Sequence, residues 1–154
     1  MKISLIGVGK IKRGPERAMV DDYMSRAKKL AKPLGFRDIQ EIEVDAGPDQ
    51  AGEGQKLLAK VPDGAKLVLF DETGESTTSR ALARKVGKLR DDGCPELCFV
   101  IGGADGFTDE IKAQAADKIC LGKLTWPHKL VRVMASEQIY RSLSLLAGTP
   151  YHRD

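Results

Sequence analysis

Short apolar runs alternate with amphipathic segments along the whole chain. The apolar runs predict strands, and the segments between them repeat apolar residues at helical spacing. The expected strands cover residues 2–8, 36–44, 66–71, 96–101 and 119–121. The expected helices run from Pro15 to Pro33, over about 53–61, from Leu82 to Gly93, onward from Thr108, and over about 129–147.

This repeated strand–helix order predicts an α/β fold with a mostly parallel sheet and helices on both faces. The chain has 154 residues, the length of one domain, so we expect a single domain over 1–154. Ligands of such sheets bind beyond the carboxyl ends of the strands. The loops after Phe70, Ile101 and Leu121 are therefore the candidate site.

Composition narrows the class of protein. Hydrophobic residues make up 42% and charged residues 31%, which is typical of a globular chain. The apolar runs are too short for a membrane span, and the N-terminus lacks the features of a secretory signal. Three cysteines, Cys94, Cys98 and Cys120, give no disulfide framework and no metal site. We expect buried thiols in a cytoplasmic protein without metal or membrane.

The net charge of +3 hides an uneven distribution along the chain. Residues 1–37 carry +7, residues 38–79 carry −7, residues 80–118 carry zero and residues 119–154 carry +3. Such asymmetry indicates an anionic partner better than the total does, although an ordinary solvated face remains the alternative.

The common nucleotide and hydrolase motifs are missing. Gly7-Val8-Gly9 follows the first strand, but Lys12 leaves the dinucleotide fingerprint incomplete. The sequence has no phosphate-binding P-loop and no Gly-x-Ser-x-Gly elbow. No pair of carboxylates has a distinctive acid–base context, so we interpret the Asp and Glu residues as surface charges.

Two loops remain as a site made largely of backbone. Gly102-Gly103 ends a buried strand and would let a ligand approach the main chain, although a tight turn explains two glycines taken alone better. The loop 121–128 contains the only tryptophan, Trp126, beside aliphatic residues. It is suited to a planar ligand such as adenine, with a hydrophobic cap on the core as the alternative for Trp126.

At these positions the chain resembles the ribosomal RNA large subunit methyltransferase H (RlmH) family of the SPOUT class. The resemblance covers essentially the whole sequence and rests on several motifs in order. They are Leu-Phe-Asp at 69–71, Ile-Gly-Gly-x-x-Gly at 101–106, Leu-x-x-Leu-Thr-x-Pro-His at 121–128, Leu-Val-Arg at 130–132, Glu-Gln-Ile-Tyr-Arg at 137–141 and Pro-Tyr-His-Arg at 150–153.

The resemblance implies a SPOUT fold with a C-terminal trefoil knot, a homodimer and the cofactor S-adenosyl-L-methionine. It implies methylation of N3 of a pseudouridine in 23S ribosomal RNA, in the stem-loop at the subunit interface of the assembled ribosome. The implied cofactor contacts are Phe70, Gly102, Leu121, Gly122, Lys123, Leu124, Thr125 and Trp126. Phe70 and Trp126 depart from the smaller apolar residues expected in relatives, which leaves the exact shape of the pocket open.

The same resemblance makes Tyr151, His152, Arg153 and Arg132 the candidate catalytic residues. His152 has the chemistry to accept the N3 proton, and the two arginines could hold a phosphate or a pyrimidine oxygen. Without the resemblance, the tail would be interpreted as a frayed terminus. His128, next to Pro127, is expected to be structural.

Two other functions compete with methyl transfer. A nucleotide-binding module would keep the Gly102-Gly103 loop but has no use for a His-Arg tail. An RNA-binding assembly factor explains the basic ends but not the apolar loop around Trp126. The last helix, with Leu130, Met134, Ile139 and Leu143, is a candidate contributor to a dimer interface.

Overall fold

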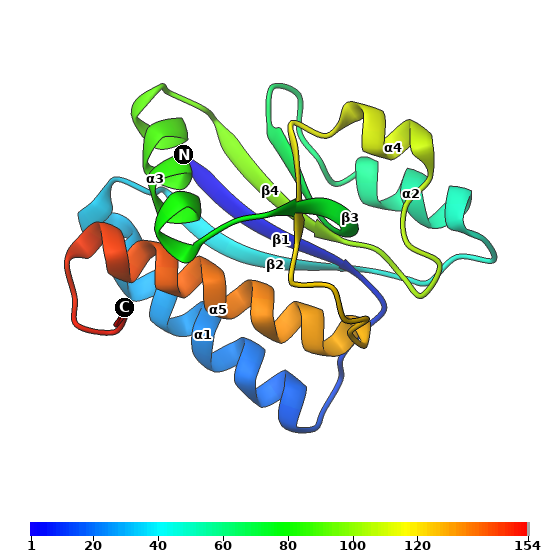
Figure 1. The fold of residues 1–154 in the computed structure, drawn as a ribbon, viewed down its shortest axis with the longest axis horizontal. Coiled ribbons are helices and arrows are strands. Elements are labelled where there is room, and N and C mark those ends of the chain that lie inside the picture. Colours follow the sequence, from blue (N-terminus) through cyan, green and yellow to red (C-terminus); the bar gives the residue numbers. More distant parts are fainter. Residues whose placement is uncertain (154) are drawn as a thin grey trace.

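The computed structural model describes residues 1–153 (Figure 1). Within this range, five strands form one entirely parallel sheet in the order β2-β1-β4-β3-β5. The strands are β1 (Lys2–Val8), β2 (Asp38–Val44), β3 (Lys66–Ser76), β4 (Glu96–Ile101) and β5 (Asp117–Cys120). The predicted α/β class with a parallel sheet is confirmed.

Helices cover both faces of this sheet, as the sequence predicts. One face is covered by α1 (Pro15–Ala31), α3 (Ser79–Asp91) and α5 (His128–Ala147). The other is covered by α2 (Gln50–Leu58) and α4 (Asp109–Gln114). A short 3-10 helix, Lys32–Leu34, follows α1 and ends at Gly35, whose positive φ of 82° suits glycine.

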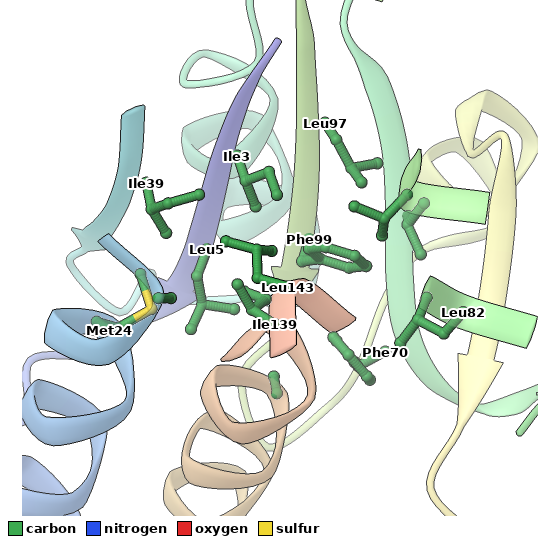
Figure 2. Close-up of a cluster of buried hydrophobic side chains, with 14 of the residues drawn as sticks. Ile3, Leu5, Met24, Ile39, Phe70, Leu82, Leu97, Phe99, Ile139 and Leu143 are labelled. Atoms are coloured by element: carbon green, nitrogen blue, oxygen red, sulfur yellow. The ribbon is translucent and has the colours of Figure 1, made fainter. Parts of the chain in front are cut away.

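The strands β1 to β4 each contribute to two hydrophobic cores because successive side chains point to opposite faces. In β1, Ile3 and Leu5 face the core beneath α1, α3 and α5, while Ile6 and Val8 face the core beneath α2 and α4. Figure 2 shows the first core, where strand residues meet Ile139 and Leu143 of α5. Both are buried, so neither is available to the dimer interface suggested for this helix.

The bounds of β3 differ most from expectation. The strand was expected to end at residue 71, but the chain leaves the ladder after Phe70 and pairs with β5 again at Glu75 and Ser76. Gly74 permits this return, because an added Cβ would lie 2.7 Å from the backbone of Ile119. The pairing joins residues that are far apart in sequence, so the polar composition of this segment did not reveal it.

The basic and acidic stretches of the sequence partly neutralise each other. Arg17 on α1 pairs with Glu41 of β2, and the buried Arg132 on α5 pairs with Glu41 and Glu43. The hydrogen bond to Glu41 raises the pKa of Arg17. The interpretation of every carboxylate as a surface charge is therefore wrong for these two glutamates, which are only partly exposed.

Glu96 is the other carboxylate that departs from that interpretation. It is 7% exposed and accepts a hydrogen bond of 2.5 Å from the Ser4 hydroxyl. Nearby, burial raises the pKa of the Cys98 thiol to about 12, and the Glu96 carboxylate adds to the effect. Cys94 and Cys98 are buried as predicted, whereas Cys120 is only half-buried.

No helix among residues 1–153 is long and apolar enough to cross a bilayer. In the same range, no cluster of three or more His, Cys, Asp or Glu side chains is arranged to hold a metal ion.

Candidate functional site

A cavity of about 320 Å³ lies at the carboxyl edge of the sheet. Its walls come from the ends of β3, β4 and β5, from the loops that follow them and from the first turn of α5. This volume is at the lower end of the range for small-molecule sites. The lining residues are Gln50, Phe70, Asp71, Glu72, Ile101, Gly102, Gly103, Ala104, Asp105, Gly106, Phe107, Lys112, Ile119, Leu121, Gly122, Leu124, Thr125, Trp126, His128 and Val131.

Seven of the eight residues expected to contact a cofactor line this cavity. They come together because parallel strands place their carboxyl ends at one edge of the sheet. Lys123 is the exception, since its exposed side chain does not contribute to the lining. The seven are Phe70, Gly102, Leu121, Gly122, Leu124, Thr125 and Trp126.

Gly102 and Gly103 form both a tight turn and a wall of the cavity. The Gly106 amide donates a hydrogen bond of 3.1 Å to the Gly103 carbonyl, which closes the turn. A Cβ at Gly102 would lie 3.2 Å from the Gly106 carbonyl oxygen and 3.3 Å from the Phe107 ring. The alternative of a tight turn is therefore correct, and the same backbone also faces the cavity.

Trp126 lies at the rim of the cavity and does not cap the core. Its side chain is 40% exposed, and the neighbouring Leu124 is 72% exposed. The indole N–H donates a hydrogen bond of 3.2 Å to the Leu121 carbonyl, which holds the loop in a closed shape. The result is an apolar surface beside the cavity that is open to a ligand or to another protein.

Asp71 and Lys112 line the cavity but are not among the residues that the sequence predicts as cofactor contacts. The Asp71 side chain is 4% exposed and lies 3.3 Å from the Lys112 ammonium. The Thr73 backbone amide also donates to Asp71, at 2.7 Å. Asp71 directly follows a buried apolar run, and this position could have identified it as a site residue from the sequence. Lys112 lies on α4, far from Asp71 in the sequence, and no sequence pattern marked it as a site residue.

The environment of Asp71 predicts a loss of stability in acid. Burial alone raises the pKa of this carboxyl, but the hydrogen bonds from Thr73 and then Lys112 outweigh it, so the pKa lies below its ordinary value of 3.8. The resulting stabilisation is complete above pH 3.8 and is lost as the pH falls through the folded-state pKa. We expect Asp71→Asn to cost about 1 kcal/mol at neutral pH and to reduce the acid dependence.

Urea unfolding at neutral pH and at about pH 3 measures both effects. Asp63→Asn, at an exposed position, serves as the control. An unchanged acid dependence in Asp71→Asn would contradict the assignment.

Arg132 does not line the cavity. Its side chain is 1% exposed, and its guanidinium is bound to the carbonyls of Val8 and Gly9 and to Glu43. A phosphate or pyrimidine oxygen would have to displace these partners. Arg132 directly follows Val131, which does line the cavity.

The described tail residues, 151–153, do not line the cavity either. Tyr151 donates a hydrogen bond of 2.9 Å to Glu137, and Arg141 lies 3.0 Å from the His152 Nδ1. Burial raises the pKa of Tyr151, and the Glu137 carboxylate adds to the rise. The tail is ordered on its own α5, near the end opposite the first turn that borders the cavity (Figure 1). His128, expected to be structural, is exposed and lines the cavity.

Comparison with known proteins gives a consistent match over the full chain. The family described as "Predicted SPOUT methyltransferase" matches residues 1–152. A protein of Hyphomonas neptunium named "Ribosomal RNA large subunit methyltransferase H" is 45% identical over 153 residues, which are 99% of each chain. A protein of the same name from Rhodopseudomonas palustris is 47% identical over 161 residues, again covering 99% of each chain.

Proposed function

Because the chain belongs to the ribosomal RNA large subunit methyltransferase H family of SPOUT methyltransferases, we propose that it methylates N3 of a pseudouridine in 23S ribosomal RNA. The methyl donor is S-adenosyl-L-methionine, and the substrate is the assembled ribosome. The observation that carries the proposal is the cavity that gathers seven of the family-implied cofactor residues at one edge of the sheet.

The cavity has the chemistry that this cofactor requires. Its apolar walls, which include Leu121 and Trp126, suit the adenine ring, and the Gly102 backbone offers peptide groups at close range. S-adenosylmethionine carries a sulfonium and an ammonium against one carboxylate, so its net charge is positive. Three lining carboxylates, Asp71, Glu72 and Asp105, against one lysine complement that charge.

The bound cofactor supplies a methyl group that its sulfonium already activates. The protein must align the base nitrogen with that methyl and exclude water, and the loop of Leu124 and Trp126 is placed to do both. The pseudouridine N3 proton must leave before or during attack. In this proposal His152 accepts that proton, and Arg153 holds a substrate oxygen or phosphate.

The tail performs this role on the cavity of a second copy of the chain. Helix α5 has 20 residues, about 30 Å in length. The tail packs against its far half, at Glu137 and Arg141, whereas His128 and Val131 of the first turn border the cavity. A homodimer that pairs the tail of one protomer with the cavity of the other would complete the site.

Exposed apolar side chains supply a surface for such a dimer. They lie on the cavity loop and near the beginnings of α1 and α5, two helices that pack together (Figure 1). The exposed residues are Met19, Leu124, Trp126 and Leu130. The trefoil knot implied by the family is part of the proposal, and it would involve the segment that leaves β5, where β5 pairs with β3, and enters α5.

The function is tested by methyl transfer to ribosomes. We expect radiolabelled S-adenosylmethionine to label purified ribosomes that carry the pseudouridine. Ribosomes from a strain lacking the pseudouridine synthase should be labelled far less, because the proposed substrate is pseudouridine and those ribosomes carry uridine instead. Free 23S RNA is the matched control. Labelling of transfer RNA instead of ribosomes would keep the class of enzyme and overturn the proposed substrate.

A further inference from the structure

We propose that Arg132 is a positioning residue that joins the basic loop 9–14 to the first turn of α5 at the cofactor cavity. The loop carries Lys10, Lys12 and Arg13, all exposed, and directly follows β1 at the carboxyl edge of the sheet. The inference rests on the proposed function in one respect, namely that the loop contacts ribosomal RNA. The contacts by which Arg132 holds this loop, called the clamp below, are a property of the free protein.

Arg132 holds the beginning of the loop through two backbone carbonyls and two carboxylates. Its Nη2 donates hydrogen bonds of 2.9 Å to the Val8 carbonyl and 2.8 Å to the Gly9 carbonyl. Its Nη1 lies 2.5 Å from the Glu43 carboxylate and 3.4 Å from Glu41. The planar arginine fork reaches carbonyls at and just beyond the end of β1 and carboxylates on β2 at the same time.

The next part of the loop is held by the same carboxylate. The Ile11 amide donates a hydrogen bond of 2.7 Å to Glu43, and the Ile11 side chain is 3% exposed. Arg17 of α1 donates to the Ile11 carbonyl at 3.3 Å. Glu43 therefore links Arg132 to the middle of the loop, and the exposed Lys12 and Arg13 follow this anchored point.

The other end of the connection is the cavity. Arg132 lies in the first turns of α5, where His128 and Val131 line the cavity. The polypeptide thus has a rigid link between a loop suited to phosphates and a wall of the cofactor site. Arg132 orients the RNA-binding loop relative to the cofactor, while the loop lysines make the contacts with phosphate.

The structure argues against direct contact between Arg132 and the substrate. The side chain is 1% exposed, and extracting this buried charge would take one of its donors from Glu43 and the Arg132 donor from two carbonyls. Its Nε has no hydrogen-bond partner among residues 1–153 and is as deeply buried as the rest of the group.

Gly7 offers a way to disturb Arg132 without changing it. A Cβ at Gly7 would lie 2.6 Å from Nη2 and 2.7 Å from Nε of Arg132. Gly7→Ala should therefore displace the guanidinium, and Arg132→Lys should keep the charge while losing the fork. Arg26→Lys is the matched control, because Arg26 is an exposed arginine on α1 paired with Asp22.

The first measurement is hydrogen exchange of the free protein. We expect the Ile11 amide to exchange at least about tenfold faster in both Arg132→Lys and Gly7→Ala, and at the wild-type rate in Arg26→Lys. Affinity for S-adenosylmethionine should change less than twofold. Unchanged exchange at Ile11 in a folded variant would overturn the clamp, whether or not the chain methylates ribosomes.

The second measurement is the salt dependence of ribosome binding. Lys12→Glu should weaken binding and lower the salt slope by about one or more units. If Arg132 acts through the loop, Arg132→Lys combined with Lys12→Glu should be little weaker than the stronger single variant. Fully additive losses would mean that Arg132 contacts RNA itself, which would overturn the positioning role. Failure of the wild-type chain to bind ribosomes would instead refute the proposed function.

Discussion

Removal of residues 151–154 should abolish methyl transfer to ribosomes and leave affinity for S-adenosylmethionine close to that of the full chain. The loss should reach at least about 100-fold, the usual contribution of a positioned acid–base group. Cofactor affinity should survive because no described tail residue lines the cavity. Methyl transfer and calorimetric titration with the cofactor measure the two effects separately.

Point variants separate the contributions of the individual tail residues to activity. His152→Asn removes the proposed base, whereas Tyr151→Phe removes only the hydrogen bond to Glu137. We expect His152→Asn to lose most of the activity of the truncated chain and Tyr151→Phe to lose less. Normal turnover by the truncated chain would rule out the tail as part of the active site.

Mixed dimers test which copy of the chain supplies the tail. A truncated chain can be paired with a chain whose cavity is blocked, each inactive alone. If the tail acts on the partner's cavity, the mixed dimer should regain about half of the wild-type activity, because one of its two sites is complete. If the tail acts within its own chain, the mixed dimer stays inactive, and the proposed arrangement is wrong.

Gly102→Val should close the cofactor site. A Cβ at this position already lies 3.2–3.3 Å from Gly106 and Phe107, so the two further methyl groups must enter the turn or the cavity. Such overpacking costs about 1–3 kcal/mol, which predicts a loss of cofactor affinity of about tenfold or more. Calorimetry measures it, and the fluorescence change of Trp126 on cofactor addition gives an independent signal.

Two controls make this result specific to the cavity. Ala51→Val adds the same kind of bulk at an exposed position on α2 and should leave cofactor affinity unchanged. Lys123 is the one expected cofactor contact that does not line the cavity. The Lys123→Ala protein should therefore also bind the cofactor with wild-type affinity. Wild-type affinity in a folded Gly102→Val protein would mean that the cofactor binds elsewhere.

Much of the fold could be predicted because burial on both faces of a parallel sheet leaves a visible signal. The strand 96–101 is buried throughout and is apolar after Glu96, because both of its faces are covered. The site followed from the same rule, since parallel strands bring Phe70, Gly102 and Leu121 to one edge. The motif order added the family and the identity of the cofactor, which periodicity alone does not contain.

The sequence by itself thus determined the class of fold, the edge of the sheet at which the cavity lies and the family to which the chain belongs. Only the tertiary structure decided that Asp71 meets Lys112, that Arg132 is buried against β1 and β2, and that the tail packs on its own helix. The physical reason is that strand and helix patterns are local, whereas these contacts join side chains from distant segments. Their partners are chosen by packing and charge neutralisation in the folded chain.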